Sequence, residues 1–468
     1  MSGYTISPTL NKSRVFILQK SELEKSLSPL YYSTLPKKLS SSRKLKEIAF
    51  INPTREKPKF NDDELVPYVG LPQTDEHSKS IIEVVLRPYK EVKGRNIIYP
   101  NELLFARIEP SVFNKKYILT KDLKGYDFAF TSTEFYVVKG NEVDNEYLLA
   151  NFLSDYVYKQ VEGKTTGSTG RRRLDTEVFA DLIFPFPEIE LRKKVSEIIT
   201  KYFSQKQNNE AEADKLLSSI DDYLLKELGI KLPEPPKNTL KNRMFVTNIS
   251  ELSGSRFDPH FNKIFFKEVF TSFSKGKFSI SRIKDVVDNI KTGTTPHQKL
   301  DPFTDNEGVV FLRNTNLKKY QIDLSDTKYV KTEFAKELTY SVKGEVIMCI
   351  AGTVGLSAKN DVENPISINQ NVSALKFDDT KINRDFAAYW FNTNIFLELT
   401  KRACSVATIF YLNNDNLKLL PIPVPPLDKQ KEIAQHITGI RQQAQQLKDK
   451  TTELLKKASE EIEEILLG

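Results

Sequence analysis

The stretch Phe184-Pro185-Phe186-Pro187-Glu188-Ile189-Glu190-Leu191 decides the fold, because the chain repeats its pattern in Leu420-Pro421-Ile422-Pro423-Val424-Pro425-Pro426-Leu427. Each stretch ends in a long helical pattern, which closes at Leu228-Gly229 in one case and at Leu467-Gly468 in the other. Proline interrupts a preceding element and is tolerated where a helix begins. The repeat therefore predicts two domains, each with its own long helix, and two such helices on one chain can pair with each other.

Three further pairs of segments repeat in the same order along the chain. They are Phe16–Leu23 with Phe245–Leu252, Leu45–Ala49 with Ile283–Val287, and Glu102–Phe105 with Glu345–Met348. The spacings between them drift by several residues, as expected when surface loops differ in length. The alternative is that short apolar segments resemble each other by chance, and the preserved order of the matches argues against this.

Composition bounds the class of protein. The 468 residues are enough for two or three domains, and 39% of them are hydrophobic. Charges of 69 basic and 62 acidic residues give a net +7, which fits a nucleic-acid partner and fits an ordinary basic surface equally well. Only Cys349 and Cys404 occur, in apolar surroundings, so we expect reduced core residues of a cytoplasmic protein. We find no signal peptide, membrane span or zinc spacing in the sequence.

The two halves outside the long helices have a mixed α/β pattern. Expected strands are Val66–Leu71, Ile81–Leu86, Glu134–Val138, Gly308–Leu312 and Glu345–Ile350. Expected helices are Asn145–Val161, Thr176–Leu182 and Arg384–Thr400. The pattern predicts an α+β fold in which two mixed domains alternate with two long helices.

The long helices have apolar residues spaced by three and four. In the first helix they include Val195, Ile199 and Tyr202, and Lys206 and Asn209 interrupt the series. The second series, from Ile433 to Ile465, is more regular. A period near 3.5 predicts an antiparallel coiled coil between the two helices, whereas an amphipathic helix packed on its own domain is the alternative.

Catalytic motifs are missing from the sequence. It has neither a G-x-x-x-x-G-K-[ST] phosphate loop nor an Asn/Asp-Pro-Pro-aromatic motif with a glycine-rich cofactor loop. Gly352-Thr353-Val354-Gly355 is expected to form a turn, and Glu234-Pro235-Pro236-Lys237 lies in a proline-rich linker. We therefore expect a protein without cofactors and without catalysis of its own. A stand-alone nuclease or methyltransferase with a cryptic site stays open, as does a coiled-coil scaffold that does not bind DNA.

The chain resembles the specificity subunit of type I restriction-modification systems over nearly its whole length. In the second half the resemblance is carried by Ile290–Pro296, Phe311–Asn314, Gly344–Ile347, Asn369–Asn371, Leu420–Gln430 and Arg256–Pro259; in the first half it is carried by Tyr68–Leu71, Glu102–Phe105 and Ser132–Phe135. The first half has Phe50-Ile51-Asn52-Pro53 in place of the Gly-Thr-Thr-Pro loop of the second half.

The resemblance implies two target recognition domains, each of which reads half of a split DNA sequence. It places them at residues 1–187 and 245–425, the helices at 188–230 and 426–468, and a linker at 231–244. It implies an antiparallel pair of helices, with the recognition domains inverted at opposite ends. The implied partners are double-stranded DNA, two methyltransferase subunits that modify adenine at N6, and two restriction subunits.

Candidate DNA contacts lie in three segments. Arginine suits guanine edges, asparagine suits adenine, and lysine and threonine suit phosphates. In the first half, a basic, hydroxyl-rich and flexible stretch offers Lys164, Thr165, Thr166, Arg171, Arg172 and Arg173; in the second half, two segments offer Lys291, Thr292, Thr294, Thr295, Arg313, Asn314 and Asn316. A solvated loop with incidental charge is the alternative for the arginines. Asn369, Gln370 and Asn371 are expected either to contact DNA or to satisfy buried backbone groups.

Overall fold

The computed structural model of the chain describes residues 39, 41–56, 58–168, 172–237, 239, 244, 246, 248, 256, 258–297, 301–304, 307–404 and 410–467. The repeated segments Phe16–Leu23 and Phe245–Leu252 and the candidate Arg171 therefore lie outside the described residues, wholly or in most of their length. No helix in the described ranges is both long and apolar enough to cross a membrane.

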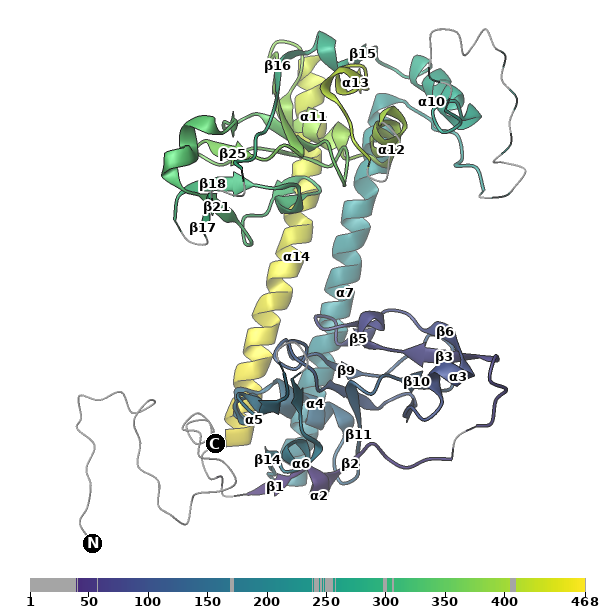
Figure 1. The fold of residues 1–468 in the computed structure, drawn as a ribbon, viewed down its shortest axis with the longest axis vertical. Helices are drawn as coiled ribbons and strands as arrows, with labels where there is room; N and C mark the ends of the chain where they lie inside the picture. Colours follow the sequence, from purple (N-terminus) through teal and green to yellow (C-terminus); the bar gives the residue numbers. More distant parts are fainter. Residues whose placement is uncertain are drawn as a thin grey trace, which may run out of the picture. The chain divides into compact units, whose positions relative to one another are not determined.

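The chain folds as two units, labelled by element in Figure 1. One unit comprises Met1–Ala211 together with Leu447–Gly468, and the other comprises Glu212–Gln446. Both are built from mixed helices and strands, which confirms the predicted α+β class.

The first unit contains two four-stranded sheets. One antiparallel sheet has the order β2 (Ala49–Ile51), β11 (Phe135–Gly140), β8 (Leu103–Ala106) and β9 (Tyr117–Leu119). The other has the order β6 (Val85–Pro88), β3 (Leu65–Val69), β10 (Ala129–Thr131) and β7 (Ile97–Ile98), with β3 parallel to β10. Three small ribbons pair β1 (Ser42–Lys44) with β14 (Ile183–Pro185), β4 (Thr74–Asp75) with β5 (Ser80–Ile81), and β12 (Thr165–Thr166) with β13 (Arg173–Leu174).

The second unit repeats this plan. Its sheets have the orders β16 (Val287–Thr292), β26 (Val372–Phe377), β23 (Val346–Cys349), β24 (Ser357–Lys359), and β17 (Phe303–Thr304), β21 (Lys328–Val330), β18 (Val309–Leu312), β25 (Ile366–Ile368), β22 (Tyr340–Ser341). Here too one pair, β18 with β25, is parallel. Its ribbons pair β15 (Ile280–Arg282) with β27 (Pro421–Pro423) and β19 (Leu317–Lys318) with β20 (Gln321–Ile322). The matched order of strands confirms the internal repeat predicted from the sequence.

The shorter helices also correspond between the units. In the first unit they are α2 (Leu45–Ile48), η2 (Leu71–Gln73), α3 (Tyr89–Val92), α4 (Asn145–Leu153), α5 (Asp155–Val161) and α6 (Thr176–Ala180). In the second they are α10 (Ile264–Ser274), η3 (Ile283–Asp285), η5 (Asn314–Asn316), η6 (Thr332–Glu337), α11 (Arg384–Phe391), α12 (Asn394–Ala403) and α13 (Asn414–Lys418).

Two helices expected to be continuous are each divided in two. Asn145–Val161 breaks at Ser154, whose hydroxyl accepts the Val157 N–H and so caps α5. Arg384–Thr400 breaks before α12, where Thr393 caps the new helix in the same way. A serine or threonine that supplies an N-cap competes with the helix that would otherwise pass through it. The expected strand Ile81–Leu86 is divided as well, between β5 and β6.

Two long helices, α7 (Ile189–Leu228) and α14 (Leu427–Leu467), match the predicted ones closely. Within the first unit, Val195, Ile199 and Tyr202 of α7 share a buried cluster with α14 residues. Those residues are Ala458, Ile462 and Leu466. Lys194 lies 3.4 Å from Glu461, and the Asn209 amide lies 3.1 Å from the Thr451 hydroxyl. As numbers rise along α7 they fall along α14, so these segments pack antiparallel.

The second unit shows the same opposite direction. Lys429 of α14 forms an ion pair of 2.7 Å with Glu227 of α7, and the rings of His436 and Tyr223 stack at 4.0 Å between centroids. The helices thus pack on each other and on their own domains at once. The finer coiled-coil geometry stays a prediction.

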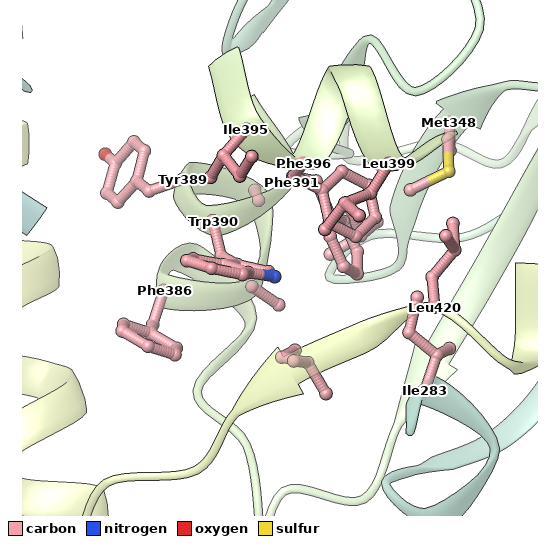
Figure 2. Close-up of a cluster of buried hydrophobic side chains, with 14 of the residues drawn as sticks. Ile283, Met348, Phe386, Tyr389, Trp390, Phe391, Ile395, Phe396, Leu399 and Leu420 are labelled. Carbon is pink, nitrogen blue, oxygen red and sulfur yellow. The ribbon is translucent and has the colours of Figure 1, made fainter. Parts of the chain in front are cut away.

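The largest core lies in the second unit and surrounds Trp390. Figure 2 shows Phe386 and Trp390 of α11 in the buried cluster that also contains Phe391, Phe396 and Met348. The Trp390 indole donates a hydrogen bond of 2.9 Å to the Pro421 carbonyl, in the second of the two Pro-x-Pro stretches. The proline-rich stretch is therefore both a helix start and a partner for a buried indole, which needs an acceptor. The two cysteines are buried and form no disulfide, as expected.

Gly293 of the Gly-Thr-Thr-Pro loop lies against the backbone of a neighbouring strand. A Cβ atom there would lie 2.1 Å from the Ile368 carbonyl oxygen and 2.3 Å from that of Asn369. The φ angle of Gly293 is not in the left-handed region, so backbone conformation does not require glycine here. The close approach of the neighbouring backbone does require it.

Gly293→Ala should lower the free energy of unfolding by about 1–3 kcal/mol, because backbone atoms rather than a flexible side chain would have to move. Chemical denaturation would measure this decrease. Gly439→Ala is the control, since its added Cβ meets no atom within 4 Å and should not destabilise the chain. Equal stability of the Gly293→Ala and wild-type chains would contradict the close-approach argument.

Candidate nucleic-acid interface

The predicted flexible stretch of the first unit is partly a β-ribbon. Thr165 and Thr166 in β12 pair with Leu174 and Arg173 in β13. The ribbon is attached to the end of β8, because Arg173 also bridges to Ile108. The flexible stretch expected from the sequence is therefore a paired ribbon at Thr165, Thr166, Arg173 and Leu174.

The two described arginines of this ribbon face carboxylates. Arg173 donates to Glu134 through Nη2 at 2.7 Å and Nε at 2.9 Å, and this pairing raises the pKa of the guanidinium. Arg172 donates to the Thr165 carbonyl at 2.9 Å and lies 3.8 Å from Glu109. Arg173 is thus held by a bidentate pair, whereas the more exposed Arg172 is held loosely.

The other candidates in this segment differ in exposure. Thr165 is buried, and its hydroxyl donates to Glu109. Thr166 is exposed, and Lys164 is half-buried beside the end of α5. Of the two candidate threonines, Thr166 is the one whose side chain is exposed.

Arg107, directly after β8, is not among the candidates predicted from the sequence. Its guanidinium lies 4.7 Å from the centre of the Tyr136 ring, and its backbone pairs with Leu174 of the ribbon. Its buried Nε has no hydrogen-bond partner among the described residues. An arginine that lies over an aromatic ring next to the ribbon is a candidate contact for an anion. The sequence around Arg107 gives little indication of this role, because a single arginine after an apolar strand is common at the ends of strands.

Lys291 of the second unit is a structural residue. Its ammonium lies 2.9 Å from the carboxylate of Glu345, whose side chain is 5% exposed, and it also donates to the Tyr340 carbonyl. The first unit has the same arrangement, in which Arg55 pairs with Glu102, 4% exposed. Losing a cation beside such a buried carboxylate is costly. The segment after Phe50-Ile51-Asn52-Pro53 lacks the Gly-Thr-Thr-Pro sequence, but through Arg55 it still supplies a cation to the buried carboxylate.

The threonines after Lys291 make mainly internal contacts. Thr292 accepts a hydrogen bond of 2.9 Å from the Asn414 amide. Thr294 donates to the Glu337 carbonyl and accepts the Thr339 N–H, both at 2.9 Å. The buried Thr295 hydroxyl has no partner among the described residues. Thr294 is the exposed member of the three.

Asn314 and Asn316, which were both predicted to contact DNA, have different environments in the turn after β18. Asn316 is 3% exposed, donates to the carbonyls of Asp323 and Asp326 at 3.0 Å each, and accepts the Arg313 N–H at 3.0 Å. Gln73 accepts the Gly70 N–H at the equivalent place in the first unit. Asn316 is therefore part of the scaffold and not free to read a base.

Asn314 has a different environment at the other end of the same turn. The structure shows no hydrogen bond from its side-chain amide to any described residue, and the amide lies next to Gly352. Arg313 is partly engaged, since it donates to the Asp326 carbonyl at 2.7 Å and carboxylate at 3.1 Å. Asn369 is buried and accepts the Asn371 N–H, which favours the alternative that these residues satisfy backbone groups.

Equivalent positions of the two units carry different chemistry. The bridge from Arg173 to Ile108 corresponds to a bridge from Tyr411 to Ala351. Phe410 and Tyr411, 41% and 44% exposed, thus stand where the first unit has Arg172 and Arg173. The Phe410 carbonyl also accepts the Gly352 N–H, which places it near Asn314. The first unit therefore presents arginines at this edge, and the second presents aromatic rings and an amide.

The described part of the chain contains no group of three or more His, Cys, Asp or Glu residues placed to hold a metal ion.

Asn316→Ala should lower the free energy of unfolding by about 1–3 kcal/mol, because it removes the buried side chain that accepts one backbone hydrogen bond and donates two. Asn314→Ala is the matched control and should leave that free energy within about 0.5 kcal/mol of wild type. Urea denaturation of the two variants would test this division of roles, and equal destabilisation would contradict it.

Comparison with known proteins gives a consistent result. Residues 275–464 match the family described as "Type I restriction modification DNA specificity domain". The MjaVIII specificity subunit of Methanocaldococcus jannaschii is 21% identical over 336 residues, which are 70% of this chain and 71% of that protein. The EcoAI specificity subunit of Escherichia coli is 26% identical over 228 residues, which are 48% of this chain and 36% of that protein.

The fold has a solved counterpart. A chain from a structure concerned with complex assembly and conformational transition of the type I R-M system aligns with a TM-score of 0.50 and 18% identity. The alignment covers 92% of this chain and 100% of that chain. At that identity it supports the fold alone. The family match over residues 275–464 and the two sequence relatives together support a specificity subunit of the type I restriction-modification kind.

Proposed function

We propose that the chain is the non-catalytic DNA-recognition subunit of a type I restriction-modification complex and reads a bipartite sequence. The single observation that carries this is the repeated scaffold with unlike surfaces. Arg172 and Arg173 in one unit correspond to Phe410 and Tyr411 in the other, while the strand order is the same. Two readers with different side chains suit two half-sites of different sequence.

Each reader would use its edge differently. In the first unit, Arg107 and Arg172 would contact phosphates or guanine edges, with Thr166 nearby. In the second, the Asn314 amide would read adenine, and Phe410 and Tyr411 would contact base or sugar surfaces. Arg171, Arg173, Lys164, Arg313 and Thr294 stay secondary candidates in this proposal.

The partners follow from the family. We propose that two methyltransferase subunits act on adenine at N6 at sites selected by this chain, and that two restriction subunits join them for cleavage. The recognition domains would comprise residues 1–187 and 245–425, joined through the helices 188–230 and 426–468 and the linker 231–244. The long helices would then fix the unread spacer between the half-sites.

Replacing Arg107 and Arg172 with Ala should weaken DNA binding and reduce the slope of log K against log salt by about 0.9 for each phosphate that the variant no longer neutralises. Binding would be measured for the assembled complex over a range of salt concentrations. Lys46→Ala is the control, because Lys46 of α2 pairs with Asp181 at 2.7 Å and is not among the candidate DNA contacts. An unchanged affinity and slope in the double variant would remove both arginines from the interface.

Mapping methylated adenines in host DNA, with and without this chain, tests the function as a whole. We expect a two-part motif that disappears when the chain is deleted. Methylation by the purified chain alone would instead favour an enzyme. Absence of any sequence preference in the assembled complex would favour a scaffold that does not read DNA.

A further inference from the structure

The first unit contains a cavity of about 480 Å³ that is lined by the β4–β5 hairpin, by residues from β9 onward and by helix α7. Figure 1 shows β5 and β9 beside α7 in this unit. The lining includes the lysines Lys79, Lys121, Lys124 and Lys206 and the carboxylates of Asp122 and Glu210. Positive side chains therefore outnumber negative ones in the cavity, and none of them is among the candidate DNA contacts.

Lys79 differs from the other lysines of the cavity, because no ion pair joins it to a carboxylate among the described residues. The structure pairs Lys121, Lys124 and Lys206 with Glu146, Asp122 and Glu210, at 3.7, 3.7 and 3.3 Å. The Lys79 ammonium instead donates to the Lys115 carbonyl and lies 5.7 Å from the centre of the Tyr117 ring. The hairpin thus brings a cation to the cavity without a carboxylate to balance it.

The surroundings of Lys79 disfavour its positive charge. Burial lowers the pKa of its ammonium to about 8, and the neighbouring cations Lys115 and Lys206 lower it as well, whereas Glu76 and Asp75 act in the opposite direction. A cation that is desolvated beside other cations is destabilised unless an anion compensates it. An anion in the cavity would supply that compensation.

The second unit has a tyrosine at the position equivalent to Lys79. Lys79 and Tyr320 have positive φ angles of 54° and 68°, and each directly precedes the second strand of its hairpin, β5 or β20. Each also bonds to the edge strand of its antiparallel sheet, since the Leu119 N–H donates to the Lys79 carbonyl and the Tyr320 N–H donates to the Ser357 carbonyl, both at 3.2 Å. The Tyr320 ring is 7% exposed and packs edge-on against Tyr389, at 5.5 Å between ring centres. The repeated scaffold therefore does not require a lysine here, and the basic cavity distinguishes the first unit.

We infer that this cavity binds a small molecule that carries phosphate groups, with Lys79 and Lys124 as its main cations. Lysine ammonium groups bind phosphates as point charges, and hydroxyl and amide groups add hydrogen bonds. Helix α7 supplies such groups to the lining through Thr200, Ser204 and Gln207. The volume lies within the range of small-molecule sites, which is roughly 300–1,000 Å³.

The rest of the lining leaves two sources for the phosphate groups. The apolar lining residues are Ile81, Leu119, Leu149 and Phe203. They would pack against a nucleoside if the ligand were a nucleotide, and they would make no specific contact with a free polyphosphate. In both cases the ligand would connect the hairpin and the residues after β9 to α7, and it would stabilise the folded first unit.

Isothermal titration calorimetry of the full chain in phosphate-free buffer tests the inference with inorganic pyrophosphate and ADP. The two probes share a pair of phosphate groups, and only ADP has a nucleoside. Saturable binding of pyrophosphate that is as tight as that of ADP would identify a free polyphosphate as the ligand, and tighter binding of ADP would identify a nucleotide. Both results support the site. No saturable binding of either probe, or equal binding of sulfate, would overturn it.

Lys79→Gln should weaken binding of the tighter probe by roughly tenfold, because the amide keeps a donor for the Lys115 carbonyl but loses the charge. Lys124→Gln should weaken it less, since Lys124 is exposed. Lys93→Gln is the matched control and should leave the affinity unchanged, because Lys93 pairs with Asp62 and does not line the cavity. The probe should also raise the melting temperature of wild type more than that of Lys79→Gln.

Equal affinities of wild type and Lys79→Gln would overturn the inference. If Lys79→Gln does not fold, as its melting curve without ligand would show, equal affinities of Lys124→Gln and Lys93→Gln would overturn it. The map of methylated adenines does not depend on this cavity, so either result leaves the proposed function intact.

Discussion

The structure depends on the burial of two apolar helix faces, each of which is covered by residues from both halves of the sequence. Ala458, Ile462 and Leu466, from the end of the chain, complete a core of the first unit. Ile220 and Leu224, from before the linker, complete the core of the second. Each unit is therefore closed by a segment from the other half of the sequence. Because apolar burial is the main favourable term in folding, this exchange ties both units to the same pair of helices.

Charge pairing then decides which cations are left for DNA. Buried carboxylates at Glu102 and Glu345 require a cation, and Arg55 and Lys291 supply it. Glu134 similarly holds Arg173. The net charge of +7 therefore combines cations that stabilise the scaffold with others, such as Arg107, whose buried Nε has no hydrogen-bond partner among the described residues. Residue type alone does not reveal this division, since it depends on which carboxylate each cation faces.

The candidate site was therefore only partly predictable. Residue type in the sequence indicated the ribbon of the first unit and the turn after β18, where Asn314 lies, as candidate DNA contacts. Asn316, two residues later, belongs to a buried turn that Gln73 repeats in the first unit. Arg107 was missed because its contacts with Tyr136 and the ribbon connect segments distant in sequence. The breaks at Ser154 and Thr393 were missed because capping by one hydroxyl outweighed an otherwise helical pattern.

The sequence by itself determined the α+β class, the internal repeat and the two long helices, and it carried the resemblance to type I specificity subunits. These features depend on patterns that are visible along the sequence. They are proline before a helix, apolar residues spaced by three and four, and short segments repeated in the same order. Only the tertiary structure decided which polar residues serve the scaffold and which remain exposed, and that Phe410 and Tyr411 replace two arginines at one edge. The physical reason is that burial and pairing are set by neighbours far along the chain, which no local pattern records.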